Sequence, residues 1–569
     1  MSGVPRLLMR VLGLASVPIM GIAAPGERLP RLGVDPLPAV VAALTPEEKV
    51  DLVVGVGMSI AGLPLPPEMR GPEGGPMAPR VPGAGGMTHA VPRLGIPSIV
   101  LADGPAGLRI QARREGEARS YHATAFPVAS VLASSWDPAL VERVGAAMGA
   151  EARDYGVDVL LAPALNIHRN PLGGRGFEYY SEDPVISGRM AAAAIRGIQS
   201  TGVAATPKHL VANEHEWNRY TIDVRVAERP LREIYLRAFE IAVREGRPQA
   251  LMTSYNRLNG LYTSQSPRLL DGVLRDEWGF DGLVMTDWFA GDDPVAQLRA
   301  GNDLLMPGTG VQHRALTAAV AGGTLTSATL DPNVTQVLGL VLRSPSFRGQ
   351  RVTDAPDLEG HARLAREAAA AGLVLLRNED ASLPLARGLK VALFGNASYD
   401  AIIGGSGSGA VAAARTVSLA EGLRAEGYDL DAALETGYKT FIEQTRRNLP
   451  PRSPLSPPER LPERAAVGAE IEAAAREADV AVVTIGRRSG EFADLSKALD
   501  FELQPGEREL LGQLSRAFRG RGKRVVVVLN IGGVIETASW RDLADAIVLA
   551  WQPDRKSTRL NSSHANISY

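Results

Sequence analysis

The chain has 569 residues, of which 45% are hydrophobic and 22% charged, and its formal net charge is −2. This composition is ordinary for a soluble globular protein of several domains, and the charge balance does not favour a nucleic-acid or other polyanion partner. The sequence contains no cysteine, which excludes disulfides and thiolate metal sites.

The N-terminus has the pattern of an export signal. Arg6 and Arg10 precede an apolar stretch from Val11 to Ala24, which ends in small residues. We therefore expect a signal peptide over residues 1–24 and a secreted or periplasmic protein of a bacterium. The alternative is an apolar N-terminus without a targeting role. The stretch is too short to span a bilayer comfortably, and no other segment resembles a membrane span, so no membrane partner is expected.

Residues 40–345 are predicted to form a barrel domain. Thr45, Pro46 and Glu48 have the spacing of a capping box at a helix N-terminus. Further on, strand-length apolar runs alternate with helical patterns, such as the segment that Asp137 and Pro138 open. This alternation predicts a (β/α)8 barrel of the TIM type. The runs are Ile99 to Asp103, Val157 to Pro163, Gly202 to Lys208, Ala250 to Tyr255 and Leu283 to Asp287.

A second α/β domain is expected over residues 361–553, after a linker at residues 346–360. A helix from His361 to Ala371 is followed by strand-like runs, a pattern that predicts a doubly wound sandwich of the (α/β)6 type. The runs are Leu373 to Arg377, Lys390 to Gly395, Val480 to Gly486, Lys523 to Asn530 and Ala546 to Trp551.

The last stretch, residues 554–569, has neither an apolar period nor turn signals. It resembles translated adapter sequence, so we expect it to be non-native. An ordinary polar tail is the alternative.

Asp287 is the most informative residue of the chain. It ends the apolar run Gly282 to Thr286 and precedes Trp288, so it is placed at the C-terminal end of a strand, where catalytic groups emerge in a parallel barrel. A carboxylate beside an indole suits attack on a sugar, whose apolar face packs on the ring. The alternative is an aspartate that caps the next helix.

Long motifs in a fixed order link the chain from about Leu44 to Pro553 to a known family. They are residues 81–86 (Val-Pro-Gly-Ala-Gly-Gly), 92–97 (Pro-Arg-Leu-Gly-Ile-Pro), 101–109 (Leu-Ala-Asp-Gly-Pro-Ala-Gly-Leu-Arg), 166–178 (from Asn166 through Arg175 to Glu178), 208–210 (Lys-His-Leu), 252–256 (Met-Thr-Ser-Tyr-Asn) and the segment ending in Asp287-Trp288. On these motifs the chain resembles glycoside hydrolase family 3, in particular its bacterial β-glucosidase branch.

The resemblance implies roles for barrel residues. Asp287 is expected to attack the anomeric carbon and form a covalent glycosyl-enzyme, with Tyr255 steadying its carboxylate. Asp103 is expected to accept hydrogen bonds from the sugar's hydroxyls at the non-reducing end, as charged partners do strongly. The full set of expected substrate-binding residues is Asp103, Arg169, Arg175, Lys208, His209, Arg219, Met252, Tyr255, Trp288 and Ser406. The alternatives are surface charges for Arg175 and Arg219 and a structural strand end for Lys208 and His209.

The second catalytic group is expected to be Glu491, in Ser489-Gly490-Glu491. This segment resembles the family's Ser-Gly-Glu-Gly-x-Asp-Arg loop but departs from it at Phe492 and Leu495. As a general acid, Glu491 is expected to have its pKa raised by partial burial and by the negative nucleophile. A surface glutamate is the alternative.

Two other motifs allow more than one interpretation. The glycine-serine run from Gly404 to Gly409 looks like a phosphate-binding loop, but it has no Walker lysine, and in the family a matching loop edges the cleft. His215, between Glu214 and Glu216, lacks the spacing of a zinc site, and we interpret it as a polar structural histidine.

The reaction implied by the resemblance is retaining hydrolysis of terminal non-reducing β-D-glucosyl residues, with the two carboxylates about 5–5.5 Å apart. We expect no cofactor and no metal, and a β-glucoside or oligosaccharide as the substrate. The alternatives are a β-xylosidase, an exo-β-glucanase, a catalytically dead sugar-binding relative, or a Schiff-base enzyme that uses Lys208. The residues after Lys208-His209 do not match the family's N-acetylglucosaminidase branch.

The resemblance also implies that the chain is truncated. The family continues past the segment Trp551-Gln552-Pro553, and we therefore expect exposed apolar surface, lowered stability and aggregation. The oligomeric state does not follow from the sequence.

Overall fold

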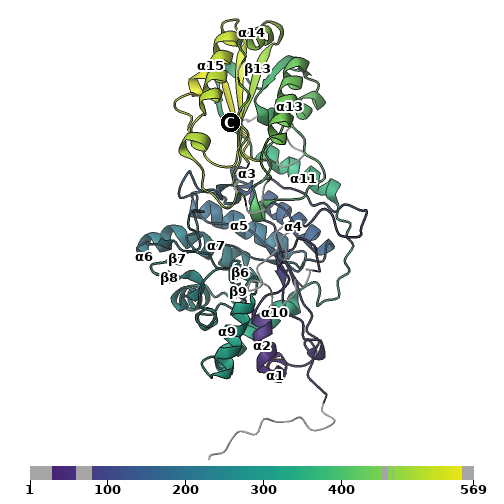
Figure 1. Ribbon diagram of the computed structural model, residues 1–569, viewed down its shortest axis with the longest axis vertical. Coiled ribbons are helices and arrows are strands. Elements are labelled where there is room, and N and C mark those ends of the chain that lie inside the picture. The colour runs from purple at the N-terminus through teal and green to yellow at the C-terminus, as the bar shows by residue number, and fades with distance from the viewer. Residues whose placement is uncertain (1–27, 59–79, 452–455, 457–458, 466, 554–569) are drawn as a thin grey trace, which may run out of the picture.

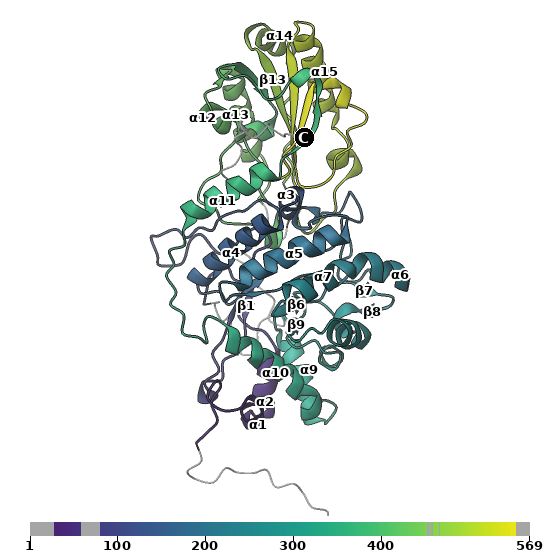
Figure 2. The same cartoon turned by 180° about the vertical axis from the view of Figure 1, so that it is seen from behind.

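The computed structural model describes residues 28–58, 80–451, 456, 459–465 and 467–553. The predicted signal peptide and C-terminal tail lie outside these ranges. The barrel domain, drawn purple to teal, and the second domain, drawn green to yellow, lie one above the other along the long axis in both views (Figures 1 and 2).

Short strands form the barrel wall, and most of them run parallel. Strands β2, β3 and β4 pair in parallel, as do β6 and β9. The bridge Leu210–Thr253 joins these two groups, and the bridge Ala164–Lys208 continues the pairing of β3 with β4. The bounds are β2 Val100–Asp103, β3 Val159–Leu161, β4 Ala204–Ala205, β6 Ala250–Met252 and β9 Leu283–Met285. All five lie within the predicted runs.

The wall closes through bridges near the N-terminus. Leu304 pairs with Met285, and Leu305 pairs with Val54. Val56 then pairs antiparallel with β1 (Gly86–Met87), which is itself antiparallel to β2. The predicted barrel is therefore present, but β1 runs against its neighbours.

Helices surround the wall, and many begin at a side chain that caps them. Thr45 and Glu48 form the predicted capping box. Asp137, Asp183 and Asp293 each accept two backbone N–H groups and precede a proline, a pairing typical of helix starts. The helices are α1 Leu37–Ala43, α2 Pro46–Val53, α3 Ala129–Ser134, α4 Pro138–Asp154, α5 Pro184–Gln199, α6 Glu228–Pro230, α7 Arg237–Gly246, α8 Pro294–Arg299, α9 Gly310–Ala321 and α10 Ser327–Arg343, with π-helical segments at Leu231–Tyr235 and Arg268–Glu277.

Glycines allow α4 and α5 to approach closely. A Cβ added at Gly145 would lie 2.5 Å from the carbonyl oxygen of Ala194, and one at Gly197 would lie 2.0 Å from that of Glu142. Both obstacles are backbone atoms, so a methyl group at either position has to push the helices apart.

We expect Gly197→Ala to lower the free energy of unfolding by about 1–3 kcal/mol, the range typical of an overpacked core. Gly339→Ala in α10 is the matched control, because a Cβ there meets nothing within 4 Å. It should leave stability unchanged or raise it by about 0.5–1 kcal/mol. Denaturant titration of both variants tests this, and equal stabilities would show that the two helices do not constrain each other.

The second domain is built on a six-stranded sheet of order β10-β15-β14-β13-β11-β12. Its pairs are parallel except β10 with β15, so the expected doubly wound sandwich is present with one antiparallel edge strand. The strands are β10 Val374–Asn378, β11 Lys390–Phe394, β12 Asp429–Leu430, β13 Val480–Arg487, β14 Arg524–Ile531 and β15 Ala546–Leu549. The helices are α12 Leu419–Ala425, α13 Ala432–Arg447, α14 Gly468–Glu477 and α15 Pro505–Arg519.

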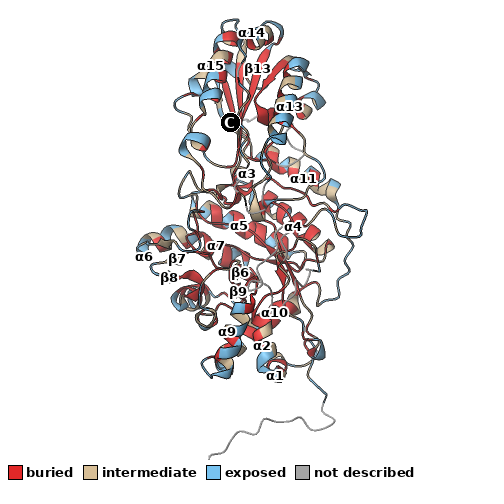
Figure 3. Ribbon diagram, in the orientation of Figure 1, coloured by how far each residue is buried: buried red, intermediate tan, exposed pale blue. Residues whose placement is uncertain are grey.

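Helix α11 (Leu358–Ala371) connects the domains and packs on the barrel. Its residues Ala365 and Ala368 belong to the barrel's hydrophobic core, and His361 Nδ1 lies 2.8 Å from Glu151 Oε1. The central strands of both domains are buried, whereas the outer helix faces are exposed (Figure 3). None of the helices in the described ranges has the length and apolar character needed to cross a bilayer.

Candidate active site

The carboxyl ends of the barrel strands bring the predicted site residues together. Asp103 is the last residue of β2, and Asp287 follows β9 by two positions. Lys208 and His209 continue from β4, and Tyr255 follows β6. All but Asp103, which is partly exposed, are buried. The site therefore occupies the rim of the barrel that faces the second domain.

Asp287 combines one satisfied and one free carboxylate oxygen. Its Oδ1 accepts a hydrogen bond of 2.7 Å from the backbone N–H of Trp288. Its Oδ2 is buried and has no hydrogen-bond partner among the described residues. Burial raises the pKa of Asp287 to about 6, although Arg175, Lys208 and Arg219 favour the ionised form. The arrangement leaves one oxygen available for attack.

His209 faces that free oxygen as a neutral ring. Arg175 Nη2 lies 3.0 Å from His209 Nε2, and a guanidinium can only donate, so Nε2 accepts and Nδ1 carries the proton. Nδ1 in turn lies 3.2 Å from Asn166 Oδ1. Burial and the nearby cations hold the pKa of His209 well below its usual range. The separation of 3.6 Å between Nε2 and Asp287 Oδ2 is therefore not an ion pair.

Asp103 is held by two cations on the opposite side of the site. Arg109 Nη1 donates to its Oδ2 at 3.0 Å, and Lys208 Nζ lies 3.7 Å from its Oδ1. The carboxylate and the two cations together present charged acceptors and donors side by side, which suits the hydroxyl groups of a sugar.

The second carboxylate, Glu491, enters from the second domain. Its Oε1 accepts 2.7 Å from the backbone N–H of Ser408, and its Oε2 accepts 2.9 Å from Arg219 Nη1. Arg175 Nη2 is 4.0 Å from Oε1. Because Arg175 also contacts His209, one arginine lies between the two predicted catalytic carboxylates.

The expectation of a raised pKa for Glu491 is wrong. Burial alone would raise the pKa, but Arg175, Arg219 and the hydrogen bonds from Ser408 together hold it well below its ordinary value. Both arginines come from barrel loops far away in the sequence. Burial raises the pKa of Glu216, which shares Arg219 with Glu491, to about 7.

The glycine-serine loop lies against Glu491, as expected of a loop that edges the cleft. Gly407 has φ +72, and a Cβ there would lie 2.7 Å from the carboxyl carbon of Glu491. Gly405 and Gly409 pack on the ring of Phe177. The Oγ of Ser406 is buried against Gly490 and has no hydrogen-bond partner in the described part of the chain.

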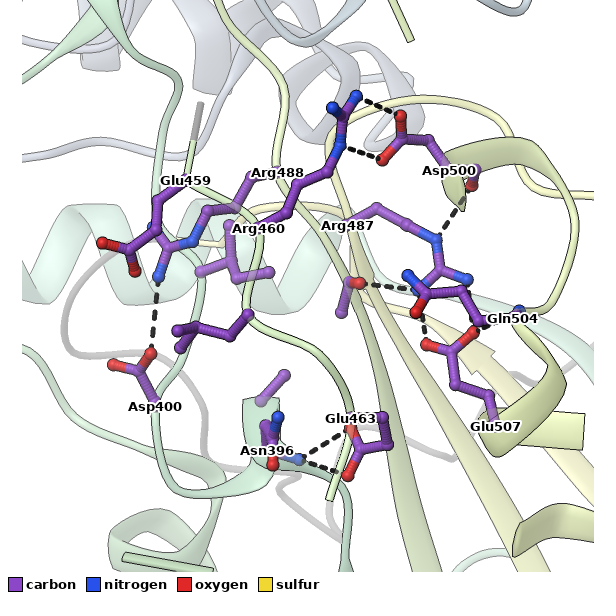
Figure 4. Close-up of a pocket in the computed structure, with 14 residues that line it drawn as sticks. Asn396, Asp400, Glu459, Arg460, Glu463, Arg487, Arg488, Asp500, Gln504 and Glu507 are labelled. Atoms are coloured by element: carbon purple, nitrogen blue, oxygen red, sulfur yellow. Dashed lines mark hydrogen bonds and ion pairs between the residues drawn. The ribbon is translucent and has the colours of Figure 1, made fainter. Parts of the chain in front are cut away.

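The root of the Glu491 loop is anchored by Arg487 at the end of β13. Arg487 donates through both Nη atoms to Glu507 at 2.6 and 2.5 Å, and through Nε to the carbonyl oxygen of Asp500 at 2.9 Å. Arg460 in turn pairs with the Asp500 carboxylate. These groups line a polar cavity of about 60 Å³ (Figure 4). The loop therefore starts from a fixed point.

The other predicted residues, Trp288, Tyr255 and Met252, differ in their contacts. Trp288 is half-buried, and its Nε1 donates to the carbonyl oxygen of Gly85 at 3.0 Å. The ring of Tyr255 packs under Arg219, whose Cζ is 4.5 Å from its centroid, but it makes no hydrogen bond to Asp287. Met252 belongs to the barrel's apolar core.

Arg169 lies apart from the cluster. Its Nε donates to Tyr235 Oη at 3.1 Å, and it borders a groove of about 660 Å³ between the domains. The structure therefore gives no support to a sugar-binding role for Arg169.

The structure adds Arg109, Glu216 and Ser408 to the residues assigned from the sequence motifs. Arg109 was noted only as part of a motif, and its contact with Asp103 depends on the turn after β2. Glu216 and Arg219 form a buried ion pair of 2.8 Å, and their i, i+3 spacing is the one sequence signal that could have indicated it. Ser408 was indicated only by its glycine-rich surroundings.

Within the described ranges, no group of three or more His, Asp and Glu side chains is placed to hold a metal ion. The arrangement offers a carboxylate with a free oxygen, a second carboxylate from another domain, and a lining of cations and hydrogen-bonding groups.

Family models match both domains of the chain. Residues 88–340 match the glycosyl hydrolase family 3 N-terminal domain, and residues 373–561 match the C-terminal domain of that family. The structure of β-glucosidase 3B from Thermotoga neapolitana in complex with glucose is similar, with a TM-score of 0.86 and 48% identity over 92% of this chain and 73% of that chain.

Two curated relatives have different names. A β-glucosidase of Rhizobium radiobacter is 46% identical over 59% of this chain and 41% of its own length. An exo-α-(1→6)-L-arabinopyranosidase of Bifidobacterium longum is 37% identical over 80% of this chain and 59% of its own length. The chain therefore spans about two fifths to three fifths of these relatives.

Proposed function

Because the chain belongs to glycosyl hydrolase family 3, we propose that it is a retaining β-glucosidase that removes terminal non-reducing β-D-glucosyl residues. One observation carries the mechanism. Two buried carboxylates from different domains, Asp287 and Glu491, face the same Arg175–His209 pair, and only Asp287 keeps an oxygen without a partner.

In the first step, Oδ2 of Asp287 attacks the anomeric carbon while Glu491 gives a proton to the leaving oxygen. A covalent glycosyl-enzyme forms, and the aglycone leaves as the alcohol. Asp287 is already positioned by the Trp288 amide, and the neutral His209 does not neutralise it.

In the second step, Glu491 removes a proton from water, which attacks the anomeric carbon and releases the sugar with its configuration retained. The ionised form of Glu491, favoured by Arg175 and Arg219, suits this step. For the first step the same group has to carry a proton, so we infer that the bound glycoside displaces the Ser408 N–H from Glu491 Oε1.

The sugar itself is expected to lie between Asp103 and Trp288. Asp103 and Lys208 offer a paired acceptor and donor to adjacent hydroxyls, and the indole offers an apolar face. Lys208 acts in this proposal as part of the polar lining, through its ion pair with Asp103, and not as an amine nucleophile.

The stereochemistry of the product tests the proposed function. Proton NMR of 4-nitrophenyl β-D-glucoside hydrolysis should show β-glucose first, with the α-anomer arising later by mutarotation. Initial release of α-glucose would exclude the two-step mechanism, and no hydrolysis would exclude the proposed substrate.

The acidic side of the pH profile is set by Asp287. Asp287 has to be ionised to attack, and its pKa is raised to about 6. For 2,4-dinitrophenyl β-D-glucoside, whose leaving group needs no proton from Glu491, kcat/KM should therefore fall about tenfold per unit as the pH drops below about 6. Steady-state kinetics between pH 4 and pH 8, roughly the range around that pKa, measure this. A profile that stays flat down to an ordinary aspartate's range would contradict the buried setting of Asp287.

A second candidate sugar is an L-arabinopyranosyl residue, because the Bifidobacterium longum relative of that name matches 80% of this chain. The same two carboxylates would serve it, and only recognition of the sugar would differ. The ratio of kcat/KM for 4-nitrophenyl β-D-glucoside and α-L-arabinopyranoside decides between the two sugars.

A further inference from the structure

The loop that carries Glu491 contacts the barrel through the carboxylate of Asp494, which belongs to the same loop. Asp494 Oδ1 accepts from the backbone N–H groups of Gly174 at 3.2 Å and Glu216 at 3.0 Å. Its Oδ2 accepts from the N–H of Trp217 at 3.0 Å. One carboxylate of the second domain thus satisfies three amides from two barrel loops.

A barrel carboxylate makes the opposite contact. Glu216 Oε2 accepts 2.8 Å from the backbone N–H of Phe492 and 2.8 Å from Arg219 Nη1. The same Arg219 atom donates to Glu491 Oε2 at 2.9 Å. Glu216 is buried, so these charge-assisted contacts are shielded from water.

The backbone between the two contacts is strained. Phe492 has φ +76, a left-handed conformation that is unfavourable for a residue with a Cβ. Two contacts hold it there: its N–H donates to Glu216, and Arg219 Cζ lies 5.1 Å from its ring centroid. Such strain persists where the surroundings fix it, and it is frequent next to reacting groups.

We propose that Glu216 and Asp494 are positioning residues that together hold Glu491 at its working distance from Asp287. The two carboxylates accept hydrogen bonds in opposite directions across the domain boundary, and we call them the reciprocal latch. Glu216 touches Glu491 only through Arg219, and Asp494 acts only through barrel amides. The proposal rests on the proposed function, because it assigns what fixes the acid/base group of that reaction.

The need for such a latch follows from the chemistry. Asp287 belongs to the barrel and Glu491 to the second domain, so any shift between the domains changes their separation. A displacement of about 1 Å costs on the order of 10²-fold in rate. The latch crosses the boundary within one to three residues of Glu491, closer than the Arg487 anchor.

The test compares leaving groups. Asp494→Ala and Glu216→Ala should lower kcat/KM on the order of 10²-fold for methyl β-D-glucoside, whose leaving alkoxide needs a proton. For 2,4-dinitrophenyl β-D-glucoside, which leaves without a proton, the loss should stay within about tenfold. Glu216→Gln keeps an acceptor for Phe492 and should lose less than Glu216→Ala. Glu182→Ala, an exposed barrel carboxylate, is the control and should match the parent chain.

A second measurement does not depend on activity. Hydrogen–deuterium exchange of a peptide spanning residues 488–496 should be about tenfold faster or more in Asp494→Ala, because the loop loses its contacts with the barrel. Equal losses on both glucosides, or unchanged exchange, would overturn the latch. An inactive parent chain would instead overturn the proposed function, and the exchange result would still decide the latch.

Discussion

Asp287→Asn is expected to lower kcat/KM for aryl β-D-glucosides on the order of 10⁴-fold, the scale of loss when an essential group of a catalytic unit is removed. The amide is nearly isosteric and can keep the 2.7 Å contact with the Trp288 N–H, so the fold should be unchanged. What disappears is the anionic oxygen that has no hydrogen-bond partner among the residues that the structure describes.

The control for this variant is Asp276→Asn, which makes the same change on an exposed helical surface of the barrel. It should leave kcat/KM and the thermal midpoint as they are. A loss smaller than about tenfold for Asp287→Asn would show that another group attacks the sugar.

Glu491→Gln is expected to give a loss that depends on the leaving group. For methyl β-D-glucoside, kcat/KM should fall on the order of 10²–10⁴-fold, because proton donation is lost. For 2,4-dinitrophenyl β-D-glucoside the first step should proceed at close to its normal rate. The second step also needs Glu491, so the glycosyl-enzyme should accumulate.

Azide provides a second test of the role of Glu491, because it attacks the glycosyl-enzyme without needing a general base. Added azide should raise turnover of the dinitrophenyl substrate by Glu491→Gln and give β-glucosyl azide as the product. Glu509→Gln on the exposed side of α15 is the control. A uniform loss on both substrates, with no effect of azide, would assign Glu491 a structural role only.

Much of the barrel could be predicted because its strands are short apolar runs that end in a polar residue. Apolar runs that end at Asp103, Lys208, Tyr255 and Asp287 place polar groups at the same rim of a parallel wall. The antiparallel strand β1 could not be predicted in this way. It consists of only Gly86 and Met87, which is too short for a pattern of alternating apolar and polar residues. The short strand β12 was missed for the same reason.

The electrostatics of the site were less predictable than its members. Asp287 and Glu491 follow from motifs, whereas the lowered pKa of Glu491 depends on Arg175 and Arg219, which only the fold brings to it. The conformation of Phe492, where the sequence departs from the family's loop pattern, could not be predicted either. The family pattern has glycine there, and the structure shows that phenylalanine adopts a left-handed conformation at that position.

The most direct test of this account is mass spectrometry of the intact chain and its peptides after incubation with 2,4-dinitrophenyl 2-deoxy-2-fluoro-β-D-glucoside. The fluorine slows both steps, and the good leaving group lets the first one proceed, so a retaining enzyme should stop as the glycosyl-enzyme. The parent chain should carry a single fluoroglucosyl adduct on the peptide that contains Asp287, and Asp287→Asn should carry none. An adduct on another residue, or turnover of glucosides by the parent chain without any adduct, would contradict it.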